Sequence, residues 1–120
     1  MDVPKIFESE YRFCLILWEH APINSTRLVG LCKEQLGWSK ATTYTVIRRL
    51  SERGVLKNEN TIVSPLITKE QAQAARVEEM MEDTFEGSVP AFLAAFSKNK
   101  RLTQEELSQI QQMIDGYKEV

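Results

Sequence analysis

The stretch SKATTYTVIRRLSERGVLKNENTIVSPLI, residues 39–67, changes its hydrophobic period halfway along. Its first half places one stripe of inward-facing residues at the three- and four-residue spacing of a helix: Thr43, Val46, Ile47 and Leu50. Ser39 is a good N-cap, and Gly54 can adopt the left-handed conformation that often follows a helix. The first half therefore predicts a helix over 39–53.

The period becomes extended directly after that helix. Segments 55–58 and 61–67 contain apolar and β-branched residues, and Glu59 and Asn60 between them are suited to a tight turn. The second half of the stretch therefore predicts a β-hairpin.

Two amphipathic helices are predicted before this stretch. The first covers 8–19 and is stopped by Pro22, and the second covers 26–36, with Asn24 and Ser25 as suitable caps. Three short helices followed by a hairpin form a winged helix-turn-helix.

Three more helices are predicted after the hairpin. Capping boxes at Thr68 and Thr103 each place a Gln or Glu three residues after the Thr, and each opens an amphipathic segment. The first of these segments reaches Phe85, and another helix covers 89–97. We therefore expect a mainly α fold, with a winged helix of three helices and a short hairpin wing followed by a C-terminal helical region.

The two predicted domains, 1–68 and 69–120, differ in the sign of their net charge. The net charge is −2, but residues 1–68 hold nine Lys or Arg against seven Asp or Glu (+2), whereas 69–120 hold six against ten (−4). Segment 39–57 alone has five basic residues against one acidic residue (+4). Positive charge is thus concentrated where contacts with nucleic-acid phosphates would form.

The outer face of the helix over 39–53 is the predicted DNA-reading surface, because the second helix of a helix-turn-helix enters the major groove. The base-contact candidates are Lys40, Ala41, Tyr44, Thr45 and Arg48. Arg48 is suited to bidentate pairing with guanine, and Ala41 to contact with a thymine methyl group. The phosphate-contact candidates are Ser39, Thr42, Arg49 and Arg53, with Lys57 and Asn58 on the wing. An ordinary solvated helix face has the same composition, but the adjoining hairpin favours DNA binding.

The acidic C-terminal part carries more apolar side chains than a monomer readily exposes. They are Val77, Met80, Met81, Phe85, Phe92, Leu93, Phe96, Leu107, Ile110, Ile114 and Tyr117. Packing onto the chain's own N-terminal domain would cover them. We favour a two-fold homodimer interface, because such symmetry matches a palindromic DNA site.

Other kinds of site find little support in the sequence. Cys14 and Cys32 lie too far apart for a zinc-finger motif and are expected to be buried thiols, and with only His20 as histidine we expect no metal and no cofactor. Phosphate-loop, HExxH and GxSxG motifs are absent, which argues against an enzyme. The longest apolar run, 13–18, is too short for a membrane span, and no signal peptide is evident, so we expect a cytoplasmic protein.

Several motifs together resemble the penicillinase repressor family, often called BlaI/MecI/CopY, over essentially the whole chain. They are ExEY at 8–11, LWE at 17–19, LGWS at 36–39, TTYTVIRRL at 42–50, RGVL at 53–56, SPLI at 64–67, FxGS at 85–88 and LTxEEL at 102–107. The resemblance implies repression by a dimer bound to a palindromic double-stranded operator near a promoter. In several members a membrane metalloprotease sensor, or a protease it activates, cuts the dimerisation region and releases the repressor. The corresponding bond here is Ala95–Phe96.

Three departures from the family pattern bear on function. Penicillinase repressors usually have Asn where Ala95 stands, which argues against induction by cleavage. Relatives commonly have Lys or Arg at the positions of Ala41 and Tyr44, so the operator need not be that of a β-lactamase gene. Copper-responsive relatives have a Cys-rich C-terminal motif, and no cysteine follows Cys32. A winged helix that binds a protein instead of DNA stays open as an alternative, supported by the short wing and the negative net charge.

Overall fold

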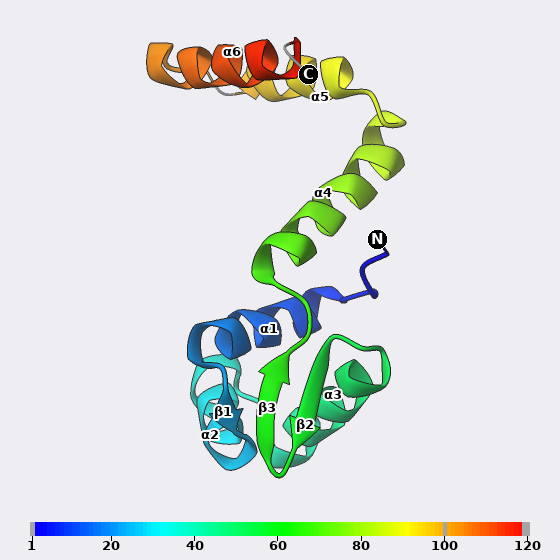
Figure 1. Ribbon diagram of the computed structural model, residues 1–120, viewed down its shortest axis with the longest axis vertical. Coiled ribbons are helices and arrows are strands. Elements are labelled where there is room, and N and C mark those ends of the chain that lie inside the picture. Colours follow the sequence, from blue (N-terminus) through cyan, green and yellow to red (C-terminus); the bar gives the residue numbers. More distant parts are fainter. Residues whose placement is uncertain (1, 100, 119–120) are drawn as a thin grey trace. The chain divides into compact units, whose positions relative to one another are not determined.

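A computed structural model of the chain describes residues 2–99 and 101–118 (Figure 1). Its contacts divide the chain into two units, Met1–Val77 and Glu78–Val120, and we call their described residues the head and the tail. Four residues within the predicted domain ranges lie outside the described residues: Met1, Lys100, Glu119 and Val120.

Helices and a small sheet alternate along the head. Their order is α1 (Glu8–His20), β1 (Ile23–Asn24), α2 (Ser25–Leu36), α3 (Lys40–Glu52), β2 (Leu56–Glu59), β3 (Ile62–Pro65) and the start of α4 (Lys69–Phe85). The predicted caps are confirmed: Asn24 accepts a hydrogen bond from the Thr26 N–H at 2.8 Å, and Gly37 ends α2 with φ 70°. The predicted three-helix winged fold is therefore correct.

The sheet contains a strand that the sequence analysis missed. Its order is β1-β3-β2, all antiparallel, with Ile23 opposite Val63 and Glu59 opposite Ile62. The expected hairpin turn at Glu59 and Asn60 was wrong by one residue, because Asn60 and Thr61 have the positive φ values, 52° and 65°. Tight hairpin turns require positive φ at their central residues, which leaves Glu59 in the ladder.

One hydrophobic core joins the helices of the head to the sheet. Its completely buried members include Phe13 from α1, Leu28 from α2 and Val63 from β3. The predicted inward stripe of α3 is confirmed, since all four of its members are buried: Thr43, Val46, Ile47 and Leu50. The opposite face of α3 is consequently left for solvent or a ligand.

The tail contains the end of α4 together with α5 (Val89–Asn99) and α6 (Gln104–Lys118). The ring of Phe92 packs edge-on against Phe85 with centroids 5.6 Å apart, and lies 5.8 Å from the ring of Phe96. No described residue of the tail is buried. Within the described part of the chain, no helix is both long and apolar enough to cross a membrane.

Candidate nucleic-acid interface

The N-terminal turn of α3 is held by its own side chains. The Ser39 hydroxyl accepts a hydrogen bond from the Thr42 N–H at 3.1 Å and donates to the Thr42 hydroxyl at 3.0 Å. The Ser39 carbonyl accepts from the Thr43 hydroxyl at 3.1 Å. The Thr42 hydroxyl accepts in this cap, so its own hydrogen remains a donor for a ligand oxygen.

The predicted base-contact residues of α3 differ in their exposure to solvent. Lys40, Ala41 and Arg48 are exposed, whereas Tyr44 and Thr45 are half-buried. The Tyr44 hydroxyl lies 3.5 Å from the hydroxyl of Ser25, which is buried at the start of α2. Tyr44 therefore links the two helices of the helix-turn-helix, and it keeps part of its ring at the surface.

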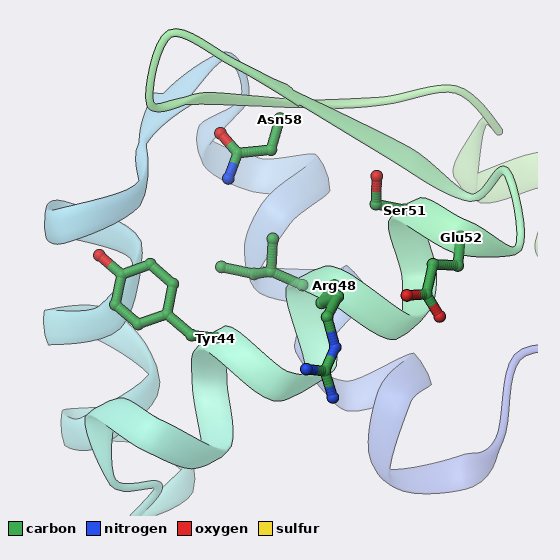
Figure 2. A pocket seen from close by; sticks show the side chains of 6 residues that line it. Tyr44, Arg48, Ser51, Glu52 and Asn58 are labelled. Atoms are coloured by element: carbon green, nitrogen blue, oxygen red, sulfur yellow. The ribbon is translucent and has the colours of Figure 1, made fainter.

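An open hollow of about 330 Å³ lies between α3 and β2 (Figure 2). Its lining residues are Tyr44, Ile47, Arg48, Ser51, Glu52 and Asn58. Figure 2 shows Arg48, Ser51 and Glu52 on α3 and Asn58 on the strand above it. Ser51 was missed in the sequence analysis, although it follows Arg48 by three residues and so shares its helix face. Arg48, Ser51 and Asn58 bring polar groups to the hollow, but most of its exposed lining is apolar.

The two predicted wing contacts point to opposite faces of the sheet. Lys57 and Asn58 are consecutive residues of β2, so their side chains alternate, and only Asn58 lines the hollow. The Lys57 ammonium lies 3.8 Å from the Glu59 carboxylate, and both side chains are largely solvated. The structure therefore does not bring Lys57 together with the α3 residues.

Arg53 ties the end of α3 to the start of α1. Its Nη1 donates to Glu10 Oε1 and to the Lys5 carbonyl, both at 2.8 Å, and its Nη2 is paired with Glu10 Oε2. Its guanidinium also lies 5.2 Å from the centroid of the Phe7 ring. The hydrogen bond with Glu10 raises the pKa of Arg53. A phosphate contact by Arg53 stays a prediction, and the observed contacts give this residue a structural role that the sequence did not indicate.

Glu10 is buried, and the same contacts keep it ionised. Burial by itself raises the pKa of this carboxyl, but the hydrogen bonds from Arg53 and from the Phe7 N–H, with the charges of Arg53 and Arg49, hold it below its ordinary value. The Phe7 N–H donates to Glu10 Oε1 at 2.9 Å. One carboxylate thus caps α1 and anchors the C-terminus of α3.

The two cysteines lie in the core of the head, as the sequence predicted. Burial raises the pKa of Cys14 to about 12 and that of Cys32 to about 11. Glu10 adds to the shift of Cys14, while a hydrogen bond with Thr43 opposes that of Cys32. Both thiols are therefore protonated and unreactive at neutral pH.

The predicted dimerisation residues differ in exposure. Met81, Phe85, Phe92 and Ile110 are half-buried, whereas the others are exposed: Val77, Met80, Leu93, Phe96, Leu107, Ile114 and Tyr117. Tyr117 has 80% of its surface exposed. Large apolar side chains left exposed in the tail are a feature of interaction sites.

Comparison with known proteins identifies the group to which this architecture belongs. The model of the family described as penicillinase repressor matches residues 6–116. The chain belongs to the penicillinase repressor family. Membership in this family of winged-helix, DNA-binding transcriptional repressors confirms the resemblance found in the sequence motifs and agrees with a regulator that is not an enzyme.

Two relatives match most of the chain, and one solved structure matches a little over half of it. The penicillinase repressor of Bacillus licheniformis is 21% identical over 120 residues, 97% of this chain and 94% of its own length. An uncharacterized 16.5 kDa protein of Latilactobacillus sakei is 27% identical over 114 residues, 92% of this chain and 78% of its own length. The solution structure of monomeric Bacillus licheniformis BlaI, in complex with the blaP half-operator, covers 58% of this chain and 90% of that one, with TM-score 0.51 and 24% identity. This structural likeness supports the winged-helix fold.

Proposed function

We propose that this penicillinase repressor family protein acts as a homodimer that binds a palindromic operator through the exposed face of α3. The observation that carries the proposal is the position of Arg48, which is exposed on α3 beside the hollow that borders the wing. The related BlaI monomer is in complex with a DNA half-operator. One head per half-site is the corresponding arrangement for this chain, with 1–68 as the DNA-binding domain and 69–120 as the dimerisation region.

Sequence discrimination in this proposal comes from few side chains. Arg48 has the planar pair of donors that matches guanine O6 and N7, and the small side chain of Ala41 leaves room for a thymine methyl group. Lys40, Tyr44 and Thr45 complete the set of base contacts. Affinity comes from phosphate contacts, for which Ser39, Thr42 and Arg49 lie along α3 and Lys57 and Asn58 lie on the wing.

The exposed apolar side chains of the tail support the dimer. Leu107 and Ile114 are seven residues apart on α6, so they lie on one face of the helix, and each leaves 44% of its surface exposed. A second copy of the same helices would bury such a stripe symmetrically. Occupancy of the operator by the dimer would then exclude polymerase from the promoter.

Induction by proteolysis would require access to the Ala95–Phe96 bond. This bond lies inside α5, whose backbone groups are engaged in helical hydrogen bonds. A metalloprotease sensor, or the protease it controls, would have to open α5 before cutting it. This requirement and the departure at Ala95 both argue for release by another signal.

The decisive experiment is a mobility-shift titration of full-length protein on DNA from upstream of its own gene. We expect binding that falls steeply with salt, because phosphate contacts release counterions. Arg48→Ala should cost about 1 to 3 kcal/mol on the preferred site and less on random DNA. Arg12→Ala is the matched control, since Arg12 is an exposed cation on α1.

Two results would count against the proposal. Equal losses for Arg48→Ala on preferred and random DNA would make Arg48 a phosphate contact only. A wild-type protein that binds no duplex at low salt would favour the protein-interaction module.

A further inference from the structure

The first half of α4 is fixed to α1 by a cation stacked on an aromatic ring. The guanidinium carbon of Arg76 lies 4.0 Å from the centroid of the Tyr11 ring, and its Nη2 donates to Glu8 Oε2 at 2.7 Å. Glu8 and Tyr11 are three residues apart, so they occupy the same side of α1. A guanidinium suits this site because it is planar, stacks on a ring and keeps donors at its edge for a carboxylate. We call these three residues the Arg76 latch.

Two further contacts, at Ile67 and at Ala72, hold the residue that leads into α4 and the first turn of this helix. The Trp18 ring meets Tyr11 edge-on, with centroids 5.8 Å apart, and the Trp18 indole N–H donates to the Ile67 carbonyl at 2.9 Å. Ala72, on the first turn of α4, is buried in the core of the head. The chain is therefore held at Ile67, at Ala72 and at Arg76, and three such points fix the direction of this helical segment relative to α1.

The latch contributes more to direction than to stability. The side chains of Arg76 and Glu8 are 38% and 75% exposed, and solvated ion pairs add little to the free energy of unfolding. The hydrophobic core of the head includes Phe13 and Leu17 of α1 but neither Arg76 nor Glu8. The latch instead restricts the direction of α4 relative to α1.

We propose that the Arg76 latch makes the protein selective for the spacing between two operator half-sites, by fixing the direction in which α4 leaves each head. The inference rests on the proposed homodimeric binding of a palindromic operator. If the two heads of a dimer are held rigidly, both copies of α3 enter major grooves only at certain spacings between the half-sites. Heads carried loosely accept more spacings, and they bind the best spacing more weakly because ordering them costs entropy.

The test uses full-length protein and a half-site taken from duplexes that the wild type selects from random DNA. One duplex carries a single half-site, and a series carries two half-sites whose separation is changed by about 1 to 3 base pairs from the preferred one. Arg76→Ala and Tyr11→Leu remove the stacking, whereas Tyr11→Phe keeps the ring. Lys69→Ala removes an exposed cation from the same helix without touching the latch.

We expect Arg76→Ala and Tyr11→Leu to lower the affinity ratio between preferred and shifted spacings about fivefold, with single half-site affinity kept within about twofold. Tyr11→Phe and Lys69→Ala should keep the wild-type ratio. Amide hydrogen exchange over 70–77 should become faster in Arg76→Ala, which reports the loosened helix without DNA. If Tyr11→Leu does not fold, Arg76→Gln takes its place.

Three outcomes would overturn the inference. A wild-type ratio in Arg76→Ala and Tyr11→Leu would show that the latch has no role in spacing, while leaving operator binding intact. An equal loss on the single half-site and on every spacing would make Arg76 a DNA contact or a stability residue. A wild-type protein that binds duplexes with two half-sites no more tightly than the single half-site, at every spacing, would overturn the homodimer proposal and the latch together.

Discussion

The head and the tail both contain many apolar side chains, but the head buries them and the tail leaves them exposed. In the head, Phe13, Leu28 and Val63 are completely buried, because strand pairing between β1 and β3 brings distant parts of the chain onto one core. In the tail no described residue is buried, and Met113 and Tyr117 lie largely exposed. Apolar content alone therefore does not make a core. The head is expected to be stable by itself, whereas the tail is expected to depend on a second copy.

The largest effect should follow from emptying the core of the head. Phe13→Ala should lower the free energy of unfolding by about 3 to 5 kcal/mol, because it leaves a cavity in the core of the head, where the ring is completely buried and stacks on Trp38. Urea unfolding followed by tryptophan fluorescence measures this loss. Leu15→Ala, two residues along α1 but 37% exposed, is the control and should cost below about 1 kcal/mol. Equal losses at both positions would contradict the described core.

The next effect belongs to the tail and should depend on protein concentration. Ile114→Asp should weaken the dimer by about 2 to 4 kcal/mol, because it places a charge in a desolvated apolar interface. Light scattering over a dilution series measures the change in mass. Gln109→Asp, an exposed polar position on α6, should leave the dimer intact. If Ile114→Asp stays dimeric, the interface does not include this face of α6.

The Glu10–Arg53 pair should make the stability of the head depend on pH in the acid range. The pKa of Glu10 is lower in the folded head than in the unfolded chain, so its stabilising effect is complete above the unfolded pKa and is lost as pH falls through the folded one. Glu10→Gln should cost about 2 kcal/mol near neutral pH and little in acid.

Urea unfolding between about pH 3 and pH 7 tests the role of Glu10. Glu19→Gln, at an exposed position of α1, is its control. A constant difference between Glu10→Gln and wild type across this range would show that the ion pair adds no net stability.

The smallest expected loss of stability comes from removing the capping threonine of the same motif, once in the head and once in the tail. Thr68 and Thr103 each accept a hydrogen bond from the N–H three residues later, at 3.0 Å and 3.1 Å. Replacing either by Ala should cost about 1 kcal/mol. Thermal melting should show the Thr68→Ala loss at every protein concentration, whereas the Thr103→Ala loss should change the concentration dependence of the tail transition. Identical behaviour of both variants would indicate that head and tail unfold as one unit.

Local signals predicted most of the fold, and long-range contacts account for what they missed. Helical periodicity and cap residues placed every helix within a few residues, since they act within one or two turns. β1 is two residues long and exists only through pairing with β3, so its sequence carries no period. The pairing of Arg53 with Glu10 spans 43 positions and depends on the packing of α3 against α1. For the site, periodicity identified the exposed face of α3, but the hollow with Ser51 and the separation of Lys57 from Asn58 required the register of the wing.

The buried thiols of the head have a practical consequence for labelling chemistry. With pKa values of about 12 and 11, Cys14 and Cys32 hold about one thiolate in ten thousand or fewer at neutral pH, and the fold shields both from reagents. A cysteine introduced at an exposed position such as Ser108 would therefore react selectively with a maleimide dye or spin label. A single reporter can thus be attached to the tail while Cys14 and Cys32 are kept.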